Sequence, residues 1–199
     1  QVTRRLRLVP GLRADYFAYN EELTLSPRLG VLVQSGPQTL LSGAVGVYHQ
    51  APTYRELRGD PAPGTSAFQT LDGDIASPRS VQAVVGLEHF FTTRRLGLRA
   101  EAYAKRFSNL ISYDVENVRV VYSAENDSEG WAAGADVQLR GELVPGLESW
   151  VTYGLLFTEE RFYAPAEALA QGGVVAEQAA ARYASRGAGD WLPRPTDPR

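Results

Sequence analysis

Two acidic segments hold the side chains that could coordinate a metal ion. They are residues 72–74, with the sequence DGD, and residues 125–129, with the sequence ENDSE. A calcium-binding loop needs oxygen ligands at fixed positions over about twelve residues, and neither segment has that spacing. Carboxylates in surface loops are ordinarily solvated. We therefore predict that the chain has no metal site.

The other reactive residue types are sparse. The sequence has no cysteine and only two histidines, His49 and His89. Each histidine falls on the apolar side of an alternating segment, near the end that leads into a loop, and lacks the second ligand of a metal site. We predict that both are interfacial residues rather than ligands or bases. No glycine-rich phosphate loop, GxSxG elbow or HExxH helix occurs, so the sequence predicts no enzyme and no cofactor.

The clearest structural signal is the alternation of side chains between residues 80 and 106. Val81, Val85 and Leu87 share one parity, whereas Gln82 and Glu88 fall on the other. A period of two is typical of a strand with two different faces. The pattern stops at residues 92–95 and restarts, which predicts an antiparallel hairpin. About ten alternating residues at roughly 3.3 Å each, tilted by about 45°, would cross a lipid hydrocarbon layer.

The same alternation predicts seven strands, at residues 5–19, 24–34, 39–50, 79–92, 95–107, 130–142 and 148–161. After the second strand, short turns around Gly36, Thr93 and Pro145 alternate with long loops around Pro61, Asn117 and Gln178, and residues 20–22 are the one short connection on the long-loop side. Antiparallel up-and-down strands place all short turns at one end and all long loops at the other. We therefore predict an all-β, antiparallel up-and-down transmembrane β-barrel with short periplasmic turns and long extracellular loops. Seven strands would leave two unpaired edges in lipid, so the remaining strands are expected outside this sequence.

Composition excludes other classes. A formal net charge of −3 with scattered signs argues against a nucleic-acid surface. No apolar run approaches the roughly 20 residues of a membrane helix, whereas barrel strands show only alternation. The absence of cysteine excludes disulfide bonds and thiolate ligands.

The polar parity of the predicted strands carries charged side chains. We predict that they face the barrel lumen and pair with one another, as Arg99 can with Glu101 and Glu88. The alternative is the solvated face of an ordinary sheet. The predicted lumen-facing residues are Arg13, Asp15, Arg28, Glu88, Arg99, Glu101, Lys105, Asp136 and Arg140.

Aromatic and polar residues in the long loops, and at the strand ends that lead into them, are the candidates for solute contact. The short turns cannot form a concave site, whereas the loops supply both apolar and polar groups. The alternative is that the loops only shield the barrel mouth. The candidates are Tyr48, Gln50, Tyr54, Arg55, Tyr122, Asn126, Tyr163, Tyr183 and Trp191.

Six short motifs occur in order along the chain: residues 10–15 (PGLRAD), 26–30 (SPRLG), 46–52 (GVYHQAP), 86–88 (GLE), 101–103 (EAY) and 134–137 (GADV). Together they resemble the middle to later barrel of TonB-dependent outer-membrane receptors. The resemblance implies a receptor and TonB-dependent active importer of a scarce solute, of the siderophore, vitamin, saccharide or peptide class, in the outer membrane of a Gram-negative-type bacterium. It implies as partners outer-membrane lipid, the plug domain and remaining strands of the same protein, and the TonB energy-coupling complex. The plug domain, the terminal strand and the N-terminal region that meets TonB are not recognised in this sequence.

Two alternatives share the same strand pattern. A passive porin or an adhesin-type barrel would have the strands without a plug. A soluble all-β binding domain would bury the apolar parity inside a sandwich. The N-terminal sequence of the whole protein discriminates the first alternative, and partition between detergent and water discriminates the second.

Overall fold

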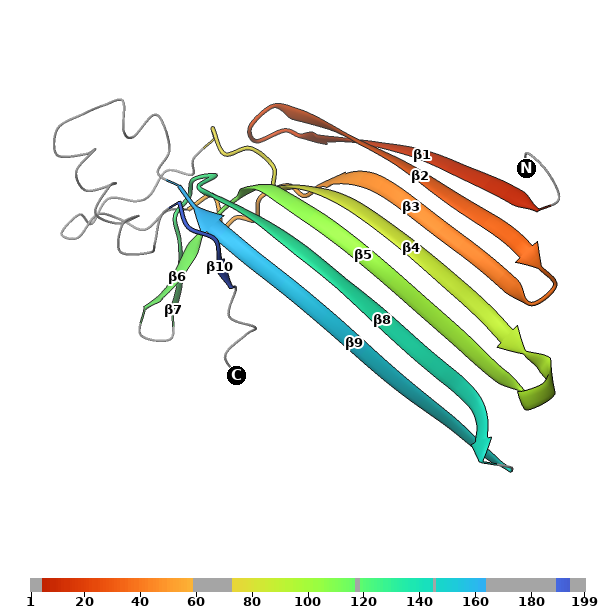
Figure 1. The fold of residues 1–199 in the computed structure, drawn as a ribbon. Coiled ribbons are helices and arrows are strands. Elements are labelled where there is room, and N and C mark those ends of the chain that lie inside the picture. Colours follow the sequence, from red (N-terminus) through yellow and green to blue (C-terminus); the bar gives the residue numbers. More distant parts are fainter. Residues whose placement is uncertain (1–4, 59–72, 117–118, 145, 164–188, 194–199) are drawn as a thin grey trace.

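The computed structural model describes residues 5–58, 73–116, 119–144, 146–163 and 189–193. Its main feature is one curved sheet of long strands lying side by side (Figure 1). Every long strand pairs antiparallel with its neighbour, in the order β1-β2-β3-β4-β5-β8-β9. The all-β, up-and-down architecture predicted from the alternation is confirmed. The long strands are β1 Leu6–Phe17, β2 Glu22–Gly36, β3 Thr39–His49, β4 Arg79–Phe91, β5 Leu96–Leu110, β8 Ser128–Val144 and β9 Leu147–Phe162.

The connections between these strands gather at two ends of the sheet. At the turn end, residues 37–38, the 3-10 turn η1 (Thr92–Arg94) and residues 145–146 join successive strands. At the loop end lie residues 18–21 and the described parts of the other connections, which are residues 50–58, 73–78, 111–116, 119–127, 163 and 189–191. Among the described residues, no helix has the length and apolar character needed to span a membrane.

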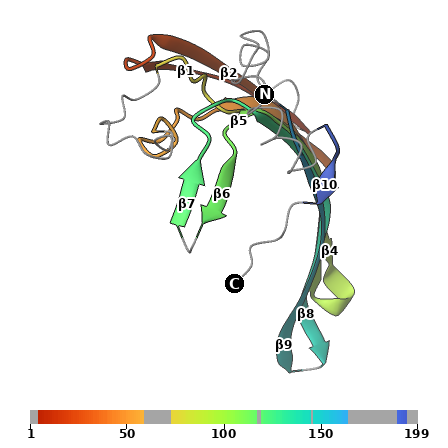
Figure 2. The same ribbon diagram turned by 90° about the vertical axis from the view of Figure 1, so that its left-hand side faces the viewer.

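One predicted loop contains regular structure. Within the segment expected to be a loop at 108–128, β6 (Tyr113–Glu116) pairs antiparallel with β7 (Arg119–Tyr122) as a separate two-stranded sheet. β5 also continues to Leu110, past its predicted end, by means of an irregularity between Phe107 and Leu110. The short strand β10 (Leu192–Pro193) pairs with Glu160 and Glu159 of β9. Figure 2 shows the β6–β7 hairpin on the concave side of the curved sheet.

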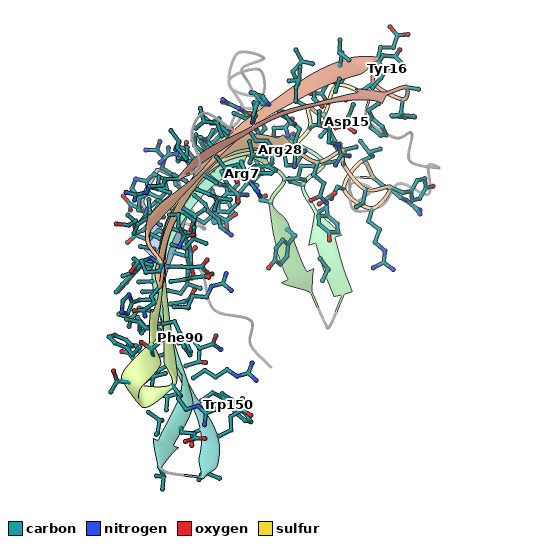
Figure 3. The ribbon with its side chains drawn as sticks, turned by 90° about the vertical axis from the view of Figure 1, so that its right-hand side faces the viewer. Arg7, Asp15, Tyr16, Arg28, Phe90 and Trp150 are labelled. Atoms are coloured by element: carbon teal, nitrogen blue, oxygen red, sulfur yellow. The ribbon has the colours of Figure 1, made fainter. Side chains whose placement is uncertain are left out.

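The pairing register assigns every strand residue to one of two faces. Gly86, Glu101 and Asp136 lie opposite one another on β4, β5 and β8, and their neighbours Val85 and Ala102 pair on the other face. Figure 3 shows the concave and the convex side of the sheet. Arg7, Asp15, Arg28 and Trp150 point to the concave side, whereas Tyr16 points to the convex side.

The convex face is apolar and exposed to the surroundings. Leu12, Val85 and Phe157 are 70%, 62% and 62% exposed. Among the described residues, the buried hydrophobic cluster is small and lies at the loop end, where Leu57 and Ile75 meet two residues of the 111–127 connection. A continuous apolar face of this size is suited to contact with lipid hydrocarbon.

Candidate functional site

Charged side chains cover the concave face. All nine residues predicted to face the lumen share one face in the pairing register, as the alternation required. Arg99 bridges Glu101 at 2.8 Å and Glu88 at 3.8 Å, and Arg140 bridges Glu148 at 2.8 Å. These pairs are largely exposed, so each contributes little to stability. Their main consequence is a polar inner surface that suits water, a polar solute or another protein segment.

Aromatic side chains lie among these charges nearer the loop end. The guanidinium of Arg28 lies 5.9 Å from the centre of the Tyr48 ring, and the Lys105 ammonium lies 5.4 Å from that of Tyr103. Tyr48, Tyr103 and Lys105 line a small cleft of about 60 Å³ on this face. Tyr48 therefore combines an aromatic ring and a nearby cation on the concave side of the sheet.

A larger cavity of about 230 Å³ lies at the loop end, between the ends of the strands and the β6–β7 hairpin. It is lined by both apolar and acidic or hydroxyl-bearing side chains, the mixture expected of a small-molecule site. Two of the predicted solute contacts, Gln50 and Tyr122, line it. The full lining is Gln50, Ala51, Glu56, Pro78, Leu110, Ile111, Tyr113, Tyr122 and Glu160.

Asp127 holds the hairpin that forms one wall of this cavity. Its carboxylate is fully buried and accepts hydrogen bonds from the backbone N–H and the hydroxyl of Ser112, at 2.8 and 2.6 Å. The Ser123 hydroxyl donates a third bond at 3.2 Å. Ser112 and Ser123 immediately flank the hairpin, so one buried carboxylate closes its base.

Asn126 ties the hairpin connection to the preceding loop. Its side-chain oxygen accepts the N–H of Ala76 at 2.8 Å, and its amide group donates to the carbonyls of Ala76 and Asn109 at 2.9 and 2.8 Å. Glu22, the first residue of β2, links the same loop to the sheet, because its carboxylate accepts the N–H of Ser77 at 3.0 Å. Asn126, predicted to contact solute, thus engages its amide in holding two loops together.

The other predicted contacts lie in several places. Tyr54 is 64% exposed and, with Arg55, lies in the loop beside the cavity without lining it. The backbone N–H of Tyr163 donates to the carbonyl of Asp127 at 3.0 Å. Burial, together with the carboxylates of Glu129 and Asp127, raises the pKa of the Tyr163 hydroxyl. Tyr183 lies outside the described residues.

Trp191 is placed away from the cavity. Its ring centre lies 5.0 Å from the guanidinium of Arg106 and 4.8 Å from that of Arg161. Arg106 pairs with Trp131 and shares the parity of Ala102 and Ala104, so this contact belongs to the convex face.

Seven of the nine lining residues were not among the predicted contacts, and three of these seven, Glu160, Tyr113 and Glu56, have side chains that can form hydrogen bonds. Glu160 lies on the concave parity at the loop end of β9, so its position could have been derived from the strand pattern. Tyr113 belongs to the hairpin that was expected to be loop, and the β-branched and aromatic residues of YDVE and RVVY were its available signal. Glu56 had no local signal, because it reaches the cavity through the course of a loop.

The two histidines occupy opposite ends of the sheet. His49 lies at the loop end, with its Nδ1 3.1 Å from the Ser26 hydroxyl. The predicted position of His89 near the loop end is wrong, because β4 runs from the loop end to the turn end and His89 is close to its last residue. Its Nδ1 lies 2.8 Å from the hydroxyl of Thr39, and its ring packs edge-on against Phe91. In the described part of the chain, no group of three or more acidic or histidine side chains is arranged to hold a metal ion.

Comparison with solved structures finds the same fold in outer-membrane receptors. The outer-membrane transporter YddB from Escherichia coli superimposes with a TM-score of 0.63 at 15% identity, over 79% of this chain and 23% of that chain. The siderophore receptor PirA from Pseudomonas aeruginosa gives a TM-score of 0.58 at 17% identity, over 83% and 35%. The ferric enterobactin receptor PfeA from Pseudomonas aeruginosa, solved as a mutant in complex with enterobactin, gives 0.59 at 18% identity, over 82% and 29%.

This chain thus spans between about a quarter and about a third of the length of those receptors. A search of curated protein sequences found no match. The family model for the β-barrel of TonB-dependent receptor-like proteins matches residues 1–196. The chain therefore belongs to the TonB-dependent receptor-like β-barrel family and forms part of a bacterial outer-membrane protein.

Proposed function

We propose that this chain supplies seven strands of the barrel of a TonB-dependent active importer, and that the whole protein takes up a scarce solute across the outer membrane. The observation that supports this most strongly is the match of the family model to residues 1–196. The described strands of this region form a sheet with one charged and one apolar face, as a barrel wall requires. The plug domain, the remaining strands and the region that meets the TonB complex would come from other parts of the protein. Because the chain belongs to an outer-membrane family, the alternative of a soluble all-β binding domain is not proposed.

The loop-end cavity is the proposed first contact of the solute. Gln50, Tyr113 and Tyr122 offer hydrogen-bonding and aromatic groups there, and Tyr48 lies further inward on the concave face. Tyr54, Arg55 and Tyr163 remain proposed outer contacts in the loops that surround the cavity. A solute released from the cavity would pass along the polar concave face once the plug has moved.

Ferric siderophores are the first solutes to test, because two structural neighbours are named for them. Cells that carry the full-length gene should accumulate at least one ⁵⁵Fe-labelled siderophore from a chemically diverse panel. We expect this accumulation to disappear when TonB is deleted, because movement of a plug requires energy from the TonB complex.

Two outcomes would contradict the importer. Accumulation that is equal with and without TonB, together with a steady open conductance in planar bilayers, would identify a passive porin. Adhesion to a surface or cell without uptake of any panel member, or of vitamin, saccharide and peptide probes, would identify an adhesin.

The loop end should face the exterior of the cell. Because this chain has no cysteine, a single cysteine introduced into it is the only thiol in this part of the protein. We expect Tyr54→Cys to react with a membrane-impermeant maleimide on intact cells, since Tyr54 is highly exposed at the loop end. Thr93→Cys, in the η1 turn, should react only after the outer membrane is permeabilised. The reverse pattern would invert the topology.

A further inference from the structure

A cluster of charged and aromatic side chains lies on the convex face at the loop end. Arg106 of β5 donates to Glu129 at 2.6 Å, and Arg161 of β9 donates to the same carboxylate through Nε at 2.7 Å. The ring of Trp191 lies against both guanidinium groups. These four residues are called the rim cluster below. Figure 1 shows β10, which follows Trp191, beside β9 at this end of the sheet.

The rim cluster begins where the apolar band of the convex face ends. On β5 the convex positions from Leu96 to Ala104 are all leucine or alanine, and the next convex residue is Arg106. On β9 the convex positions from Val151 to Phe157 are apolar, and Glu159 and Arg161 follow. Outward-facing apolar bands of barrels are about 25 Å tall, so the charges begin at the expected boundary between hydrocarbon and headgroups.

The rim cluster itself carries a net positive charge. Within the rim cluster, two arginines share one glutamate. Arg79 and Glu159 lie on the same face nearby, and Asp190 immediately precedes Trp191. The side chains of Arg106 and Arg161 are 50% and 37% exposed, whereas that of Glu129 is 17% exposed. The outward surface of the cluster therefore presents guanidinium groups rather than the carboxylate.

The chemistry that fits this surface is a phosphate group attached to acyl chains. Guanidinium groups bind phosphate oxygens through paired hydrogen bonds, and tryptophan is suited to the level of the lipid headgroups, where one part of the ring is apolar and the other is polar. The apolar band directly below would contact the acyl chains. The sheet separates the rim cluster from the cavity on the concave face, so one solute cannot contact both.

We propose that the rim cluster is a binding site for the phosphorylated headgroup of an outer-leaflet lipid. Arg106 and Arg161 hold the phosphate, Trp191 spaces the two guanidinium groups, and Glu129 competes with the phosphate for them. The site rests on the proposed topology, in which the convex face meets lipid and the loop end faces the exterior, and does not depend on the identity of the imported solute.

Native mass spectrometry of the full-length receptor in non-ionic detergent can test this site with lipid A as the probe. We expect Arg106→Gln combined with Arg161→Gln to weaken lipid A binding roughly thirtyfold, because each arginine near an anionic lipid surface strengthens binding by roughly fivefold. Arg140→Gln is the matched control, since Arg140 also pairs with a glutamate but lies on the concave face at the turn end. It should leave lipid A binding unchanged.

Glu129→Gln provides a test that does not rely on losing an arginine. It removes the competing carboxylate and should strengthen lipid A binding roughly fivefold. Lipid A stripped of its phosphates should bind weakly to every variant. Unchanged or weaker binding by Glu129→Gln, or unchanged binding by the double arginine variant, would show that the cluster only holds residues 189–193 against the sheet. Displacement of lipid A by an equal concentration of inorganic phosphate would show a site for a free anion instead.

Discussion

Val85→Arg is expected to destabilise the refolded barrel by about 2 to 4 kcal/mol, which is the cost of a positive charge near the midplane of the bilayer on the lipid face. Val85 lies in the middle of β4, pairs with Ala102 on β5 and Gly43 on β3, and is 62% exposed on the convex face. Neighbouring residues on that face are apolar and cannot compensate the charge. The measurement is equilibrium unfolding of the full-length barrel in liposomes.

Asp136→Arg is the matched control for depth. Asp136 lies opposite Glu101, which in turn lies opposite Gly86, the residue after Val85. Asp136 is therefore close to the level of Val85 but lies on the concave face. An arginine there meets the Glu101 carboxylate and water, so we expect a change in the free energy of unfolding of less than about 1 kcal/mol. Equal destabilisation by both variants would contradict the assignment of the convex face to lipid.

Asp127→Ala is expected to release the β6–β7 hairpin without unfolding the barrel. The substitution leaves the buried N–H and hydroxyl of Ser112 without their acceptor, which costs about 1 to 3 kcal/mol for each unsatisfied group. Hydrogen exchange of the amides at residues 112–123 should therefore accelerate by about a hundredfold or more, while exchange in β4 and β5 stays slow. Solute affinity should also fall, because Tyr113 and Tyr122 form one wall of the cavity.

Asp127→Asn tests whether protection of the hairpin depends on the hydrogen bonds of residue 127 or only on the size of its side chain. Its Oδ1 can still accept the Ser112 N–H, and its amide group can donate to the Ser112 hydroxyl, so we expect it to recover more than half of the lost protection. Exchange rates that match the unmodified protein in Asp127→Ala would contradict the role of this carboxylate. A global loss of folding in both variants would show that the hairpin is not an independent unit.

The sequence by itself determined the strands and their two faces. Period-two alternation is a property of each strand alone, since successive side chains must point to opposite faces. Short turns then bring neighbouring strands into antiparallel pairs, and one parity, from Arg13 to Arg140, becomes one surface. The six motifs in order were enough to indicate the family that the comparison over residues 1–196 established.

Only the tertiary structure decided how the loops are used. Asn126 bonds to Ala76, 50 residues away, and Glu22 to Ser77, 55 residues away, and no local pattern encodes such pairs. Loop composition alone therefore placed Asn126 among solute contacts, although its amide joins two loops. The hairpin at residues 113–122 was missed because its strands have only four residues each, too few for alternation to stand out from chance.

The same limit explains Trp191 and the cavity. Trp191 lies outside the alternating strands in the sequence, so no parity predicts its face, and its contact with Arg106 and Arg161 on the convex side was beyond sequence reasoning. The cavity is assembled from the ends of β5 and β9, the β6–β7 hairpin and the loop between β3 and β4, and its shape exists only once these segments have packed. Strand faces follow from backbone geometry that repeats every two residues, whereas a cavity between loops follows from contacts between residues far apart in the chain.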